Sequence, residues 1–278
     1  MSWHPNDLLV DRDLAAYERA ILTQFGESQW QAARTKTFED WLFPILRSHG
    51  YDPARLRTRF EADAVLGYTS SVYADKSGAA SDTTADDLNL ATILATPASD
   101  YLYIGSARPF RGLFWLMADA LASADARIAV HYWAGSWVEL DVVDATHGFK
   151  SGGSVTWDAP PDWVLRTLST LSTRLYWARV SVATVPTGAK AGQVSVVRAS
   201  ALRAPCTFRT LASIFREAPT SADGPWLEKA QYYASEADAS LLRALPLIAG
   251  EFDSDGSDAL SEAEADVTVA APFSMERA

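Results

Sequence analysis

The sequence predicts an α+β protein in which a helical bundle is built from both chain ends and an antiparallel β-sandwich of jelly-roll type is inserted between them. Apolar residues recur at helical spacing near each end, short runs in the middle alternate with period two, and an acidic segment closes the chain. We therefore divide the 278 residues into an N-terminal helical part (1–90), an inserted β-sandwich (91–204), a C-terminal helical part (205–250) and an acidic extended tail (251–278).

The helical parts carry apolar stripes that need partners. Residues 12–26 and 28–48 place large apolar side chains three or four positions apart, and Pro44 predicts a kink or break in the second segment. Residues 208–217 and 226–245 repeat this pattern on the two sides of a Pro/Gly turn. Because an isolated helix cannot bury its own apolar stripe and is only marginally stable, we expect the helices of both chain ends to pack together.

Three further segments complete the helical and loop predictions. Asp52 followed by Pro53 is typical of a helix start, so a third helix is expected over 53–66. The small, polar residues 74–87 are expected to form a loop. The run 110–123 is predicted to be a helix that crosses the strands.

The strands of the middle region are predicted from alternation. Residues 127–133 and 137–143 flank an Ala-Gly-Ser turn and predict a hairpin. The clearest strand is 175–184, and shorter ones are expected at 101–104, 154–157 and 193–200. In the clearest strand, one face is predicted to carry Tyr176, Ala178, Val180 and Val182, and the other to carry Trp177, Arg179 and Ser181.

Charge and composition exclude several classes. The net charge is −11, and residues 251–278 hold eight acidic residues and one basic residue, a net charge of −7. Such a surface repels nucleic acid and does not suit tight DNA binding. The sequence contains no run of about 18 apolar residues, so it predicts no membrane-spanning helix. The lone Cys206 excludes an internal disulfide and a cysteine-based zinc site, and we predict no cofactor.

Few residues suggest catalysis, and we predict that the chain is not an enzyme. It has no HExxH, GxSxG or Walker A motif. Glu139 and Asp141 lie two positions apart, as glycosidase acids could, but the polar face of a strand explains them better. Asp144 and His147 are interpreted as polar turn residues. Cys206 is interpreted as a small buried apolar residue or as a thiol in a helix-cap region.

Two binding interpretations stay open beside their simpler alternatives. Residues 253–264 resemble a calcium loop, but Asp258 stands where that loop requires glycine, so a solvated acidic turn is favoured. Six of the ten tryptophans lie in the middle region, where they could stack on sugar rings or fill the core. Core packing is favoured, and two or more tryptophans on one exposed face would favour sugar. The six are Trp115, Trp133, Trp137, Trp157, Trp163 and Trp177.

The order of the C-terminal elements resembles that of head-to-tail adaptor (connector) proteins of tailed bacteriophages. A short helix (208–217) is followed by a longer helix with Ala230-Gln-Tyr-Tyr233, an acidic DSDGSD turn and a short β-prone end at 271–277. The middle region, with the run Val155–Trp163 before Leu175–Arg179, resembles β-modules of phage tail and neck proteins. The large inserted β-domain departs from the usual small adaptor.

The resemblance implies a structural virion protein of the neck, assembled in the host cytoplasm. It implies a ring, commonly of twelve copies, that docks on the portal protein, contacts a downstream neck or tail completion protein and continues the DNA channel without binding DNA specifically. The C-terminal segment would bind the portal, because a short β-prone segment can add a strand to a partner or insert apolar side chains in a groove. The residues implied are Thr268, Val269, Phe273, Met275 and Arg277.

The alternative function is a carbohydrate- or receptor-binding component of a phage tail or baseplate. It would act through the tryptophan-rich sandwich. The two hypotheses differ in which part of the chain meets the partner: the helices and tail in the first, the face of a sheet in the second.

Overall fold

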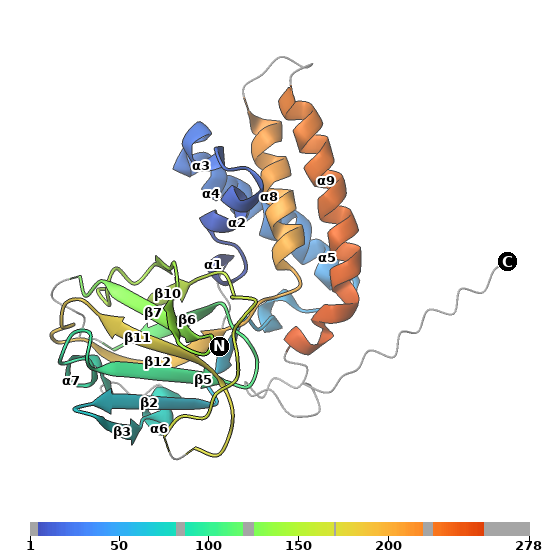
Figure 1. Cartoon of the computed structure of the whole chain (residues 1–278). Coiled ribbons are helices and arrows are strands. Elements are labelled where there is room, and N and C mark those ends of the chain that lie inside the picture. Colours follow the sequence, from blue (N-terminus) through green and yellow to red (C-terminus); the bar gives the residue numbers. More distant parts are fainter. Residues whose placement is uncertain (1–4, 82–86, 119–124, 170, 219–224, 253–278) are drawn as a thin grey trace, which may run out of the picture. The chain divides into compact units, whose positions relative to one another are not determined.

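A computed structural model describes residues 5–81, 87–118, 125–169, 171–218 and 225–252, and its ribbon shows a helical part and a strand-rich part (Figure 1). The chain divides into two compact units. The first, called here the helical unit, takes residues 1–58 and 199–278, and the second, the β-unit, takes residues 59–198. The predicted fold class is confirmed: N-terminal helices pack with C-terminal helices, and antiparallel sheets are inserted between them.

The helical unit is made of short N-terminal helices and two long C-terminal ones. Two 3₁₀ segments, Pro53–Arg55 and Leu245–Glu251, follow the N- and C-terminal helices respectively. The helices are α1 (Pro5–Leu8), α2 (Asp11–Tyr17), α3 (Ile21–Gln24), α4 (Glu27–Lys36), a π-helical segment (Thr37–Leu42), α5 (Phe43–Ser48), α8 (Arg203–Glu217) and α9 (Pro225–Ala244).

The structure shows the detailed form of two helical segments that were predicted near the N-terminus. The segment 12–26 is two helices, α2 and α3, because the chain leaves helical conformation at Glu18. The predicted irregularity near Pro44 is a change from π-helix to α-helix just before it. Proline cannot donate a backbone hydrogen bond, so it is tolerated where the helix changes its winding.

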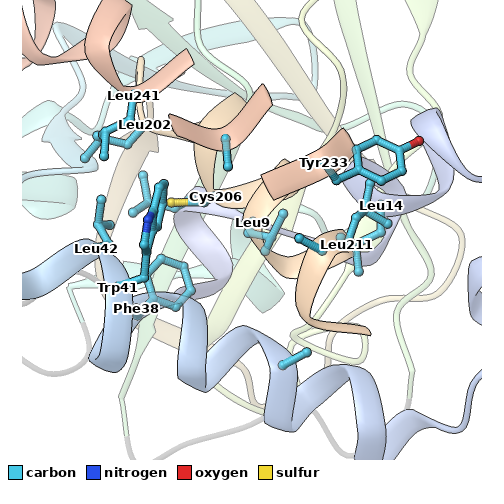
Figure 2. Packing of buried hydrophobic residues seen from close by; sticks show 14 of the residues in the cluster. Leu9, Leu14, Phe38, Trp41, Leu42, Leu202, Cys206, Leu211, Tyr233 and Leu241 are labelled. Atoms are coloured by element: carbon cyan, nitrogen blue, oxygen red, sulfur yellow. The ribbon is translucent and has the colours of Figure 1, made fainter. Parts of the chain in front are cut away.

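One hydrophobic core joins the two chain ends. The stripe of α9, with Ala230, Tyr233, Ala237 and Leu241, is buried as the pattern predicts. Figure 2 shows side chains of both chain ends gathered in this core. The labelled residues there include Phe38, Trp41 and Leu42 from the N-terminal part and Leu202, Cys206 and Leu241 from the C-terminal part.

The β-unit is a sandwich of two antiparallel sheets. One sheet has the order β1-β12-β6-β10-β9, with β4 also paired to β12, and the other has the order β3-β2-β5-β11-β7-β8. Two short helices, α6 (Ser77–Ser81) and α7 (Leu90–Ile93), accompany the strands. The strands are β1 (Arg59–Glu61), β2 (Ala64–Thr69), β3 (Val72–Asp75), β4 (Leu88–Asn89), β5 (Tyr101–Ser106), β6 (Gly112–Met117), β7 (Ile128–Trp133), β8 (Trp137–Glu139), β9 (Val143–Asp144), β10 (Gly153–Thr156), β11 (Tyr176–Val182) and β12 (Lys190–Val197).

The inward side chains of the two sheets share one hydrophobic core. Strand β11 alternates as predicted, with Ala178 and Val180 in this core and Trp177 on the opposite face. The hairpin β7–β8 is also confirmed, with Trp133 opposite Trp137. Side chains from both sheets, among them Val65, Ile104, Leu113, Trp115, Val130, Val155, Val180 and Val196, form the core.

Two predicted helices are wrong. Residues 53–66 form a 3₁₀ turn followed by β1 and the start of β2, because Arg59–Glu61 pair with β12. Residues 112–117, within the predicted helix 110–123, form strand β6, whose backbone pairs with both β12 and β10. Pairing on both sides outweighs the helical preference of its leucines and methionine.

The insertion therefore begins earlier than the sequence suggested, at residue 59, and ends at residue 198. The stretch expected as a loop over 74–87 contains the end of β3 and helix α6, while residues 82–86 lie outside the described part of the chain. The two ends of the insertion meet, because Arg59 lies opposite Val197 in an antiparallel pair.

Candidate functional site

Polar contacts join the N-terminal helices to the C-terminal helices. The buried carboxylate of Asp13 accepts a hydrogen bond from Arg203 Nε at 2.9 Å and a second contact from Nη2 of the same guanidinium. Glu18 accepts hydrogen bonds from Lys229 Nζ at 2.7 Å and from Tyr233 Oη at 3.0 Å. Burial, followed by the contact with Glu18, raises the pKa of Tyr233, so its hydroxyl stays a donor. These contacts fix α2 and the following turn on α8 and α9.

An aromatic stack lies beside these polar contacts. The Phe215 ring stacks between Trp226 and Tyr233, with centroid distances of 5.4 Å and 5.8 Å. Phe25 meets the edges of Phe215 and Trp226 at 5.9 Å and 5.8 Å. The stack thus contains rings from α8, α9 and the end of α3, and it buries the apolar stripe that neither chain end could bury alone.

The last described residues are fixed on the helical unit. Ser200 Oγ donates to the Glu251 carboxylate at 2.5 Å, and the Ala201 N–H donates to it at 2.9 Å. The ring of Phe252 stacks on Tyr51 with a centroid distance of 4.7 Å. We call Tyr51, Ser200, Ala201, Glu251 and Phe252 the tail anchor, because residues 253–278 follow it directly.

The tail anchor contains a carboxyl group in an unfavourable environment. Burial raises the pKa of Glu251, and the hydrogen bonds from Ser200 and Ala201 offset only part of that increase. The backbone of the same residue is also engaged, since its carbonyl accepts from the Arg57 N–H at 2.7 Å. The anchor therefore joins the C-terminal end of the described chain to both sides of the insertion.

A groove of about 430 Å³ is lined in part by residues that directly follow the tail anchor in the sequence. These lining residues are Asp52 and Pro53, which come after the anchor residue Tyr51. Its lining is mainly apolar, with charged side chains among the rings, and comprises Thr35, Phe38, Glu39, Phe43, Arg47, Asp52, Pro53 and Ala54. A second, smaller cavity of about 200 Å³ lies between the π-helical segment and α8 and is lined by Lys36, Asp40, Trp41, Arg209, Arg216 and Glu217, among others.

None of the predicted portal-binding residues falls within the described part of the chain. Thr268, Val269, Phe273, Met275 and Arg277 lie outside the described residues, and so does the acidic segment 253–264 that resembles a calcium loop. Sequence reasoning missed the tail anchor that precedes them. Its signal in the sequence was Phe252, an aromatic residue directly before an acidic run.

The two acids considered for catalysis are both exposed. Glu139 ends strand β8 and lies opposite His131, whereas Asp141 follows the strand. Exposure on the edge of a sheet is what the polar-face interpretation expects. Cys206 is fully buried in the helical core, as predicted, and burial raises the pKa of its thiol.

Asp144 and His147 belong to a turn, as the sequence suggested. The Asp144 carboxylate accepts hydrogen bonds from the backbone N–H groups of Thr146 at 2.7 Å and Gly148 at 2.8 Å. His147 has a φ of 52° in this turn, and its side chain is exposed. The Asp144 carboxylate therefore stabilises the backbone of this turn.

The tryptophans of the β-unit divide into two groups. Trp115, Trp157, Trp163 and Trp177 are buried, as core packing requires. Trp133 and Trp137 are partly exposed, and their centroids are 5.3 Å apart on one face of a sheet. This is the arrangement that favours the alternative of sugar stacking.

Neither a metal centre nor a membrane span is found in the described part of the chain. Across those residues, no three His, Cys, Asp or Glu side chains are grouped so that they could hold an ion. No described helix combines the length and the apolar character that crossing a bilayer requires.

Comparison with known protein families and with curated proteins gave no significant match to this chain. Its function is therefore inferred from its residues and their geometry.

Proposed function

We propose that the chain is a structural virion protein, a head-to-tail adaptor that forms a ring, docks on the portal protein and continues the DNA channel toward the tail. The observation that carries this proposal is the helical unit itself: helices from both chain ends share one core, and the tail anchor fixes the start of the C-terminal segment on it. A rigid base with an extension beyond it is suited to joining stacked rings.

The charge distribution supports a conduit for DNA. The chain carries a net charge of −11, and a negative surface does not hold the phosphate backbone as the DNA moves past. The arginines that join the chain ends are occupied within the helical unit, as Arg203 with Asp13 shows. DNA thus passes the protein without being recognised by it.

The C-terminal segment supplies the contact with the portal. Residues 266–278 combine β-branched and large apolar side chains, which can pair as a strand with a partner or fill pockets on it. In this proposal Thr268 and Val269 favour the extended form, Phe273 and Met275 insert, and Arg277 pairs with a carboxylate of the portal. The acidic stretch before them keeps the segment in water until it docks.

Co-expression with the portal protein encoded in the same genome tests this role. We expect a ring-shaped complex with the full chain, seen by electron microscopy, and loss of docking when residues 266–278 are deleted. Phe273→Ala and Met275→Ala should weaken docking, whereas Ser274→Ala, between them, serves as the matched control. Normal docking of the truncated chain would contradict the role of the tail, and the absence of any complex with the full chain would contradict the adaptor function.

A further inference from the structure

The outer face of one sheet of the β-unit is unusually rich in aromatic rings. On sheet β3-β2-β5-β11-β7-β8, the side chains that point away from the shared core include Tyr residues from three neighbouring strands and Trp residues from the hairpin. We call this surface the aromatic face. Its members are Tyr68, Tyr73, Tyr101, Tyr103, His131, Trp133, Trp137, Glu139 and Arg179, joined by Arg166 from the segment before β11.

The rings form a continuous row across the strands. Tyr68 lies 4.7 Å from Tyr73 and 6.0 Å from Tyr101, measured between ring centroids. Tyr103 lies 5.4 Å from Trp137, which continues the row toward the hairpin. Most of these rings are partly exposed, whereas Tyr103 at the centre is buried. A row of large rings left in contact with water costs stability, so a function for it is expected.

Only part of this face is covered by the chain itself. The segment before β11 lies over Trp177, whose indole N–H donates to the Arg166 carbonyl at 2.8 Å. The aliphatic side chains Ala64, Leu66, Leu168 and Leu175 are buried on this side with Trp177 and Tyr103, and the partly exposed rings pack against this small core. The remaining exposed surface consists of aromatic rings with polar and charged groups among them.

Two arginines lie among the rings. The Arg179 guanidinium is 4.4 Å from the Tyr101 centroid and 4.9 Å from the Trp137 centroid. Arg166 lies 3.7 Å from the Trp133 centroid. Within the part of the chain that the structure describes, neither guanidinium forms an ion pair, and the shielded Nε of Arg179 has no hydrogen-bond partner.

The polar groups beside these arginines are hydrogen-bonding groups. His131 lies opposite Arg179 on one side and opposite Glu139 on the other. Its Nδ1 is buried without a partner, and burial together with the charge of Arg179 lowers its pKa, so the ring is neutral and can both donate and accept. Glu139 is exposed at the rim.

We propose that the aromatic face binds an oligosaccharide that carries carboxylate groups. Tyr and Trp rings stack on the apolar faces of pyranose rings, while phenol, imidazole and carboxylate groups bond the hydroxyls. The guanidinium groups, which form no ion pair within the described residues, match a carboxylate of the sugar, which planar arginine recognises with two parallel hydrogen bonds. This role belongs to the β-unit and is independent of the proposed contact between tail and portal.

A glycan array probed with the full-length protein tests the proposal. It holds oligogalacturonates, other uronic-acid glycans and sialylated glycans, together with the carboxyl-reduced galactose counterparts of the oligogalacturonates. We expect binding to at least one carboxylated glycan, about tenfold weaker binding to its reduced counterpart, and weakening by salt. No binding to any carboxylated glycan would overturn the proposal, and equal binding of the reduced form would overturn its acidic part.

Variants of the aromatic face locate the site. Trp137→Ala and Arg179→Gln should each weaken binding of the same glycan by about tenfold or more. Tyr232→Ala and Arg243→Gln, an exposed aromatic residue and an exposed arginine on α9, are the matched controls and should leave it unchanged. Tyr68→Ala serves as a second probe if Trp137→Ala does not fold. Unchanged glycan binding by folded variants would overturn the proposed site. A Trp137→Ala variant that binds the glycan normally but forms a smaller oligomer would also overturn it, because the face would then be a contact between subunits.

Discussion

The helical unit and the β-unit use their polar residues in opposite ways. In the helical unit, charged side chains such as Asp13 and Arg203 are drawn into the structure and join segments far apart in the sequence. In the β-unit, apolar side chains from both sheets form the shared core, and Arg179 with His131 and Glu139 lies on an outer face. Polar groups that connect helices serve assembly of the fold, whereas polar groups left on a sheet face are available to a ligand.

The two units also differ in whether they are formed by one continuous segment of the chain. The β-unit is one uninterrupted stretch, residues 59–198, whereas the helical unit needs both ends of the chain. Every pairing in the β-unit is local to that stretch, and its first strand lies against its last. We therefore expect the two units to unfold in separate transitions, with the helical unit the more sensitive to losses at either chain end.

The largest effects should come from removing one large buried ring in each unit. Phe215→Ala should destabilise the helical unit by about 3–5 kcal/mol, and Trp115→Ala should destabilise the β-unit by a similar amount, because each leaves a cavity. Differential scanning calorimetry should show each variant shifting its own transition. If both variants shifted a single common transition, the comparison between independent units would be wrong.

A smaller loss is expected from breaking the contact between chain ends. Asp13→Ala should lower the free energy of unfolding of the helical unit by about 2–3 kcal/mol, because it removes the buried carboxylate that accepts hydrogen bonds from the Arg203 guanidinium and the Val10 N–H. Chemical denaturation followed by helical circular dichroism measures this change. Asp238→Ala, an exposed aspartate on α9, is the control and should stay close to the parent protein.

The tail anchor should respond to pH in a defined direction. The pKa of Glu251 is raised in the folded protein, so the folded state binds the proton more tightly than the unfolded state does. The helical unit should gain stability as the pH falls through the raised pKa toward the ordinary glutamate pKa of about 4.3, and lose it as the pH rises again. Below that ordinary value the gain from this group is complete.

Glu251→Gln isolates this contribution, because glutamine keeps the size of the side chain and cannot ionise. The difference in melting temperature between parent and variant should depend on pH in that window and become constant above it. A difference that does not change with pH would contradict the buried environment of this carboxyl group.

The smallest effect is expected at the surface of the helical unit. Lys36 Nζ lies 2.5 Å from Glu217 Oε1, but the lysine side chain is exposed. Because water and salt screen such a pair, Lys36→Ala should leave both transitions in place. A clear shift in the melting temperature of the helical unit would show that this exposed ion pair stabilises the unit more than a solvent-screened pair is expected to.

Much of the fold could be predicted from periodicity. The stripe of α9 and the alternation of β11 each match a single template, helical in the first and period-two in the second. Segment 110–123 matched neither, since Leu113 and Trp115 face the core while Leu116 is exposed, within an unbroken apolar run. Residues 112–117 of this segment form a strand because they pair with β10 and β12, which lie far along the chain.

The candidate sites were less accessible to sequence reasoning. The tail anchor joins Tyr51 to Phe252, and the contact of Asp13 with Arg203 spans 190 positions, so local pattern gives no sign of either. The aromatic face did have a signal, because alternation in β7 places His131 and Trp133 on the side opposite Val130. Which rings stay uncovered depends on the segment before β11, and that is a tertiary property.

The most direct measurement concerns the helical unit built from two chain ends. Because Arg59 and Val197 are paired, residues 59–198 can be replaced by a short Gly-Ser linker between Thr58 and Ala199. Circular dichroism of this shortened chain should show a helical spectrum and one cooperative thermal transition, and residues 199–278 alone should show neither. A shortened chain that is unfolded, or an equally helical and cooperative C-terminal fragment, would contradict the account.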